Sequence, residues 1–264
     1  MNKFLISVAS MAILTTSCTN TAQKASEFDY SVDRFGDIEV LRYKVPGFED
    51  LSLNQKKLIY FLNEAALQGR DILFDQNGKY NLVIRQTLEA VYTNFNGDKE
   101  SAEFKAFEKY LKQVWFGNGI HHHYSMDKFV PEFSAEFFAE QVKALPTEAL
   151  PLAEGQSVDE LVATLSPVIF DPAVMAKRVN QAQGQDLILT SANNLYESIT
   201  QQEVEAYYNK LKDPKDQTPI SYGLNTKLVK IDGKVVELPY KAGGLYGEAI
   251  EKIVYWLKKA EEVA

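Results

Sequence analysis

Residues 223–241 read GLNTKLVKIDGKVVELPYK, and this stretch decides the fold class. Two runs that suit β-strands lie on either side of Asp232-Gly233, a pair that readily adopts the positive φ angles of a two-residue hairpin turn. The stretch therefore predicts an antiparallel β-hairpin. Because most of the remaining chain has a helical pattern, we expect an α+β fold that is helix-rich, with a small antiparallel β component.

The helical pattern consists of apolar residues that recur every three or four positions, as on one face of an amphipathic helix. Ser52, Ser101 and Ser157 stand at the start of three such segments, where a serine side chain accepts a hydrogen bond from the first turn. The pattern predicts helices at residues 53–68, 80–92, from 101 onward, 135–144, 158–165, 201–211 and 245–263.

Two further expectations concern the ends of the chain. Residues 38–45, IEVLRYKV, predict a strand that Pro46-Gly47 closes. The glycines of KAGGLYGEA predict a turn before the last helix, not a dinucleotide-binding loop. That helix is expected to point four apolar side chains inward, namely Ile250, Ile253, Val254 and Leu257.

Composition limits the function. The chain has 264 residues, of which 45% are apolar and 24% charged, and its formal net charge is −8. Its Lys and Arg residues are scattered beside glutamates instead of forming a basic stripe, as in WLKKAEE. These features are typical of a soluble globular protein, and they argue against a nucleic-acid partner.

The N-terminus has the pattern of a bacterial lipoprotein. Residues 1–18, MNKFLISVASMAILTTSC, combine Lys3, an apolar run too short to span a bilayer, and small residues before Cys18, the only cysteine. We expect 1–18 to be a lipoprotein signal peptide with lipidation at Cys18, and 19–27 a flexible tether. The protein would then be exported and anchored by lipid in the bacterial cell envelope, on the periplasmic side or in the outer membrane. Plain secretion with cleavage near Cys18 is the alternative.

The stretch GNGIHHHY, residues 117–124, contains all three histidines of the chain. Zinc hydrolases of the HExxH type need two histidines about one helical turn apart and a glutamate that activates water. Here the histidines are consecutive, so that in an extended chain only His121 and His123 share a side. The segment is expected to be a loop or short strand. Its histidines are expected simply to form hydrogen bonds or to face solvent, with the lining of a ligand cleft as the alternative; no metal site is expected.

With these residues in view, the chain resembles the N-terminal part of the dipeptidyl peptidase III family, in its bacterial branch. These are zinc exopeptidases that release dipeptides from the N-termini of peptides. The resemblance runs from about Phe28 to Ala264. The stretches that carry it are VDRFGDIEVLRYKVPGFEDLSLNQKKLIYFLNEAALQGRDILFDQNGKYN, VWFGNGIHHHYSMDKFVP, PVIFDP, SYGLNTKLVK and GGLYGEAIEKIVYWLKKAEEVA.

The resemblance implies a role for Tyr124. The family shares a block with a glycine, an aromatic residue and then Lys-Phe-x-Pro, and its aromatic residue lines the peptide-binding cleft. Tyr124 is thereby a candidate substrate-binding residue, with His123 as a weaker one, while Ser125 stands where the family commonly has glycine. The matching residues are Gly119, Tyr124, Lys128, Phe129 and Pro131.

The catalytic parts of the family are not in this sequence. An HExxGH helix, a second acidic motif and a Glu-Ser-Tyr segment supply the zinc ligands, the general base and the grip on the substrate amino terminus. We therefore expect 28–264 to be the N-terminal portion of such an enzyme. It would contain no catalytic or metal-ligating residue, bind no zinc and be inactive alone, with the missing catalytic portion as a partner.

Two other interpretations remain open. The chain is either a non-catalytic lipoprotein that binds peptides, using the aromatic supply of 15 Phe and 14 Tyr, or a remnant whose apolar surface lacks its normal cover.

Overall fold

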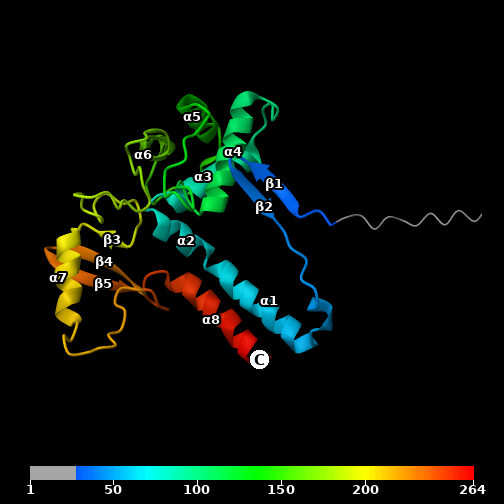
Figure 1. The fold of residues 1–264 in the computed structure, drawn as a ribbon. Helices are drawn as coiled ribbons and strands as arrows, with labels where there is room; N and C mark the ends of the chain where they lie inside the picture. The colour runs from blue at the N-terminus through cyan, green and yellow to red at the C-terminus, as the bar shows by residue number, and fades with distance from the viewer. Residues whose placement is uncertain (1–27) are drawn as a thin grey trace, which may run out of the picture.

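The structure is a computed structural model that describes residues 28–264 (Figure 1). The expected signal peptide at 1–18, the lipidation site Cys18 and the tether at 19–27 lie outside the described residues. Within the described part, no helix is both long and apolar enough to cross a membrane.

The fold is α+β and helix-rich, as the sequence predicts. The fold has a main helical body with a two-stranded ribbon beside it. A pair of long helices lies below this body in Figure 1, and a three-stranded sheet lies at the left. The main body is built from α2 (Arg70–Asn77), α3 (Asn81–Asn94), α4 (Ala102–Gly117), α5 (Ala135–Lys143) and α6 (Val158–Phe170).

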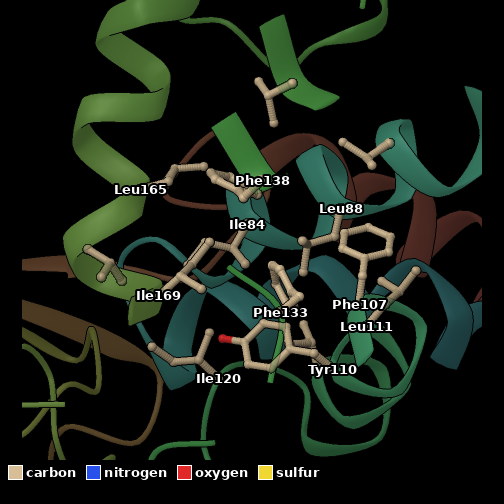
Figure 2. Packing of buried hydrophobic residues seen from close by; sticks show 14 of the residues in the cluster. Ile84, Leu88, Phe107, Tyr110, Leu111, Ile120, Phe133, Phe138, Leu165 and Ile169 are labelled. Carbon is tan, nitrogen blue, oxygen red and sulfur yellow. The ribbon is translucent and has the colours of Figure 1, made fainter. Parts of the chain in front are cut away.

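The core of the main body consists of aromatic and branched aliphatic side chains from α3, α4, α5 and α6. Leu88 and Phe107 are fully buried there, and Ile120 from the segment after α4 joins them (Figure 2). The histidine stretch is thus anchored directly in the core at its first apolar residue.

Helix α6 is longer than its predicted range, 158–165. It continues through Pro167 and ends at Phe170. A proline removes one backbone donor, but Leu165, Val168 and Ile169 on the same helix are buried in the main core, and their packing outweighs that loss.

Helices α1 (Leu53–Gln68) and α8 (Gly247–Glu261) run side by side away from the main body (Figure 1). Ser52 caps α1 in a capping box with Gln55, as the serine at its start predicts. Phe61 of α1 stacks on Trp256 of α8 with ring centroids 6.1 Å apart. Each of these two helices packs mainly against the other.

The expectation that α8 points four apolar residues inward is wrong for two of them. Val254 is 38% exposed and Leu257 is 45% exposed, whereas Ile250 and Ile253 are partly buried. A helix that packs against a single neighbouring helix buries only a narrow stripe, and Ala260 is the residue of α8 that is fully covered.

The hairpin predicted around Asp232-Gly233 is confirmed. Strands β4 (Thr226–Ile231) and β5 (Lys234–Pro239) pair in antiparallel fashion, and both turn residues have positive φ angles of 48° and 76°. Strand β3 (Tyr196–Glu197) adds to β4 in parallel, so the sheet is mixed. Helix α7 (Gln201–Leu211) covers this sheet, and a second small core forms there from Ile199, Val204 and Leu228.

The predicted strand at 38–45 is only half as long as expected. Strand β2 (Ile38–Leu41) pairs antiparallel with β1 (Ser31–Phe35), a strand that the sequence pattern did not reveal. Asp33 and Arg34 are adjacent charges and interrupt the alternation of β1, and a bulge between Ser31 and Asp33 shifts its register. Short 3-10 turns occur at Phe48–Asp50 and Thr147–Ala149.

Candidate functional site

The candidate site is the segment that leaves α4 and carries the three histidines and Tyr124. Asn118 ends α4 in the left-handed conformation, and Gly119 follows with a φ of 141°. A side chain on Gly119 would collide with the amide of Asn81, whose Oδ1 accepts the Ile120 N–H at 3.4 Å. Glycine is therefore required where the chain turns back onto α3.

His121 is buried, with an exposed fraction of 1%. Its Nε2 lies 2.7 Å from the carbonyl oxygen of Met175, and because a carbonyl oxygen only accepts, Nε2 carries a hydrogen and donates it. Burial lowers the pKa of His121 to about 4. Of the two expected roles, a hydrogen bond or exposure to solvent, this histidine has the first.

Residues 126–128 pair with residues 176–178, about fifty positions further along the chain. The Lys128 N–H donates to the Ala176 carbonyl at 3.1 Å, and the Arg178 N–H donates to the Met126 carbonyl at 2.9 Å. Asp127 and Lys177 are the central pair of this short ladder, and their side chains form an ion pair. The ladder fixes the far side of the loop.

Lys128, the lysine of the Lys-Phe-x-Pro block, has a structural role here. Its Nζ donates to the Asp171 carbonyl at 2.6 Å and to the Val174 carbonyl at 3.0 Å. These carbonyls follow the C-terminus of α6, where a cation is favoured by the helix dipole. Burial lowers the pKa of Lys128 to about 8. Phe129 beside it is buried in the main core.

His122 holds the turn that follows it. Its Nδ1 accepts the backbone N–H groups of Tyr124 and Ser125, both at 3.2 Å. Its Nε2 lies 3.4 Å from Oδ2 of Asp37, in the turn between β1 and β2. The backbone of His122 is also fixed, because its N–H donates to the Asp127 carbonyl at 2.7 Å.

His123 lies in a row of aromatic rings. Its ring centroid is 5.0 Å from that of Phe116 and 4.3 Å from that of Tyr124. Burial lowers the pKa of His123, and the neighbouring His122 lowers it further. A neutral His123 ring therefore supports the inner side of the tyrosine.

Tyr124 is 82% exposed, although the turn that carries it is held on both sides. It borders a groove of about 530 Å³ whose other wall includes Val179, Asn180 and Gln181. A second, smaller hollow of about 300 Å³, lined by Phe129, Val130 and neighbouring apolar residues, lies on the other side of Lys177. An exposed aromatic ring beside a groove that has both apolar and polar lining residues is suited to bind a peptide.

The histidines do not fit a zinc ion. His121 uses its Nε2 on a carbonyl group and its Nδ1 is buried, while His122 uses its Nδ1 on two amides. No cluster of three His, Cys, Asp or Glu side chains in the described part of the chain is arranged as a metal site. We derive no metal chemistry from these residues.

The sequence points to His123 and Tyr124, which are adjacent in the chain, but three parts of the candidate site could not be predicted from it. These are Asp37, the partner segment 175–182 and the anchor Asn81. Lys128 is the residue from which the sequence could indicate a long-range contact, because a lysine next to apolar residues needs hydrogen-bond acceptors for its ammonium group. The acceptors themselves were not visible, because they lie far along the chain.

No protein-family model matches this chain, and no curated protein gives a significant match to it.

Proposed function

We propose that the chain is the N-terminal portion of an exported dipeptidyl peptidase III-like zinc exopeptidase, anchored by lipid at Cys18. In this proposal residues 117–131 form part of the wall of the peptide-binding cleft, and Tyr124 contacts the peptide. The observation that carries the proposal is the exposure of the Tyr124 ring on a turn whose backbone is hydrogen-bonded in place.

The turn holds the Tyr124 ring in a fixed position while leaving it exposed. Ordering a turn costs conformational entropy, and an exposed aromatic ring gains nothing from burial in return. Binding a peptide supplies that burial. The tyrosine ring stacks on an apolar peptide side chain or lies against peptide bonds, and its hydroxyl donates a hydrogen bond.

Peptide binding at Tyr124 is tested with the single variant Tyr124→Ala. We expect it to weaken the affinity for a labelled oligopeptide about tenfold, the effect of about 1.4 kcal/mol, in a fluorescence polarisation titration. Tyr43→Ala is the matched control, since Tyr43 is also strongly exposed but lies at the outer end of the ribbon. Equal affinities of Tyr124→Ala and the unchanged protein would contradict the proposal.

Catalysis is assigned to the rest of the enzyme. In the family that the chain resembles, a zinc ion would supply the activated water, and no group of three His, Cys, Asp or Glu side chains among the described residues is arranged to hold that ion. We expect the chain alone to leave a dipeptidyl arylamide uncleaved. Cleavage that persists in the presence of a metal chelator would overturn this expectation. Sequencing the gene beyond Ala264 tests the same point, because an in-frame HExxGH motif would support the proposal.

The second candidate function is a non-catalytic lipoprotein that binds peptides. The groove beside Tyr124 favours it, because the groove is formed by this chain alone. A measurable peptide affinity together with a gene that stops after Ala264 would favour this candidate. A spectrum without fixed tertiary structure and strong binding of a hydrophobic dye would instead favour a remnant.

The lipid anchor is tested separately. Cys18→Ala should abolish incorporation of a radiolabelled fatty acid into the protein in bacteria that express it. Export with cleavage near Cys18 but without label would support plain secretion.

A further inference from the structure

The turn after His122 is built on a side chain instead of on a backbone carbonyl. Two successive amides, those of Tyr124 and Ser125, converge on one imidazole nitrogen, the Nδ1 of His122. Asp and Asn side chains form such turns with an oxygen that is separated from Cα by two atoms, Cβ and Cγ. Nδ1 of histidine is separated from Cα by the same two atoms. The imidazole of His122 therefore acts as the acceptor that closes the turn.

This role requires one protonation state. A nitrogen that accepts two N–H groups carries no proton, so the proton of a neutral His122 is on Nε2. The carboxylate oxygen Oδ2 of Asp37 lies 3.4 Å from Nε2, and its negative charge favours a proton on that nitrogen. The side chain of His122 is 20% exposed, whereas that of Asp37 is 72% exposed and stays hydrated.

We propose that His122 is a positioning residue for Tyr124: its neutral ring accepts the Tyr124 and Ser125 amides, and Asp37 selects the tautomer that leaves Nδ1 free to do so. The consequence for peptide binding rests on the proposed function, whereas the hydrogen bonding of the turn does not. The link runs from the β1–β2 turn through His122 to the exposed ring, across residues far apart in the sequence.

The acceptor role excludes a hydrogen on Nδ1 of His122. A hydrogen there would turn the acceptor into a donor and break both amide hydrogen bonds.

Two substitutions separate the nitrogens of the ring. In His122→Asn the side-chain oxygen takes the place of Nδ1 and keeps the acceptor, whereas His122→Gln places its polar group near Nε2 and loses it. Amide hydrogen exchange, measured residue by residue, should be about tenfold faster at Tyr124 and Ser125 in His122→Gln, and within about threefold of the unchanged protein in His122→Asn. Exchange in α4 reports whether each variant is folded.

The tautomer is measured directly on the full chain by ¹⁵N NMR of the histidine rings. We expect the His122 signals of an Nε2–H tautomer at neutral pH, with a larger share of the other tautomer in Asp37→Asn. A hydrogen on Nδ1 of His122 at neutral pH would overturn the proposal. Unchanged amide hydrogen exchange at Tyr124 and Ser125 in His122→Gln would overturn it as well.

Peptide affinity provides the functional readout. His122→Gln should weaken the affinity for the labelled oligopeptide about fivefold, and His122→Asn should restore it. Restoration by asparagine is not expected if the residue merely fills space. If the unchanged protein binds no peptide, the proposed function fails, while the exchange and NMR results still decide the role of His122.

Discussion

At the scale of single residues, three consecutive histidines have three different roles. His121 is buried and donates to a carbonyl, His122 accepts two amides, and His123 lies between Phe116 and Tyr124, edge-on to the first ring and tilted against the second. Their shared chemistry is a neutral ring that serves as donor, acceptor or flat surface. Each role depends on what the fold places opposite the ring, and not on the residue type.

His121 should make the stability of the protein depend on pH. Its pKa is lowered to about 4 in the folded chain, against about 6.5 when unfolded, so the unfolded state takes up the proton first as pH falls. The contribution of the neutral His121 to the free energy of unfolding is fully present above pH 6.5, and it is lost as the pH falls from 6.5 to about 4. It amounts to about 3 kcal/mol.

Urea unfolding of the unchanged protein and of His121→Gln between pH 7 and pH 4.5 measures this contribution. Glutamine keeps an N–H donor near the position of Nε2 but does not titrate, so its stability should fall less over that range. Parallel pH profiles for the two proteins would show that His121 is not the cause.

Gly119→Ala tests the tight approach of the loop to α3. Alanine there meets both a φ of 141° and the side chain of Asn81, and we expect a loss of about 2 kcal/mol or more in the free energy of unfolding. Gly155→Ala is the control, since its φ is 74° but nothing lies near its position. Its loss should be about 1 kcal/mol. Equal losses would mean that the contact with Asn81 is unimportant.

At the scale of elements, caps and turns were predictable while lateral packing was not. Ser52, Ser101 and Ser157 each accept an amide of the first helical turn, as their positions indicate. Strand β1 and helix α2 were missed, because charged residues interrupt the first and Gly69 separates the second from α1 by a single residue. The α1–α8 pair shows the same limit, since periodicity marks an apolar face but not how much of it a neighbour covers.

Lys128 connects the loop to the end of α6, and Lys128→Met tests that connection. Methionine keeps most of the apolar stem but leaves the Asp171 and Val174 carbonyls without their donor, so we expect a loss of about 1–3 kcal/mol in the free energy of unfolding. Lys143→Met removes an exposed ion pair with Asp159 and should cost less than about 0.5 kcal/mol. A similarly small loss for both variants would mean that the hydrogen bonds of Lys128 to the Asp171 and Val174 carbonyls do not stabilise the fold.

At the scale of the whole molecule, polar bonds hold the helical body, α8 and the sheet together. The Tyr246 hydroxyl donates to Oδ2 of Asp75 at 2.6 Å, and the amide of Asn194 donates to the same oxygen at 3.0 Å. Lys227 of β4 then donates to Oδ1 of Asn194 at 2.8 Å. This chain of bonds crosses from α2 to the loop before β3 and on to the sheet.

Tyr246→Phe removes one bond of this junction and keeps the ring. We expect faster amide exchange in α8 than in α3 relative to the unchanged protein, because the hydroxyl ties the start of α8 to α2. Tyr255→Phe, at an exposed position on the same helix, is the matched control. Uniform acceleration in both helices would mean that the junction is not a separate point of weakness.

The sequence by itself determined the α+β class, the serine-capped starts of α1, α4 and α6, and the hairpin turn. These features depend on residues close together in the chain, such as a helix cap, an Asp-Gly turn or apolar residues at helical spacing. They can therefore be predicted from the amino-acid sequence. Only the tertiary structure decided which histidine is buried, which one accepts the turn amides, and that Asp37, Asn81 and residues 175–178 complete the site. Those contacts join segments tens of residues apart, and they are selected by the packing of the core as a whole.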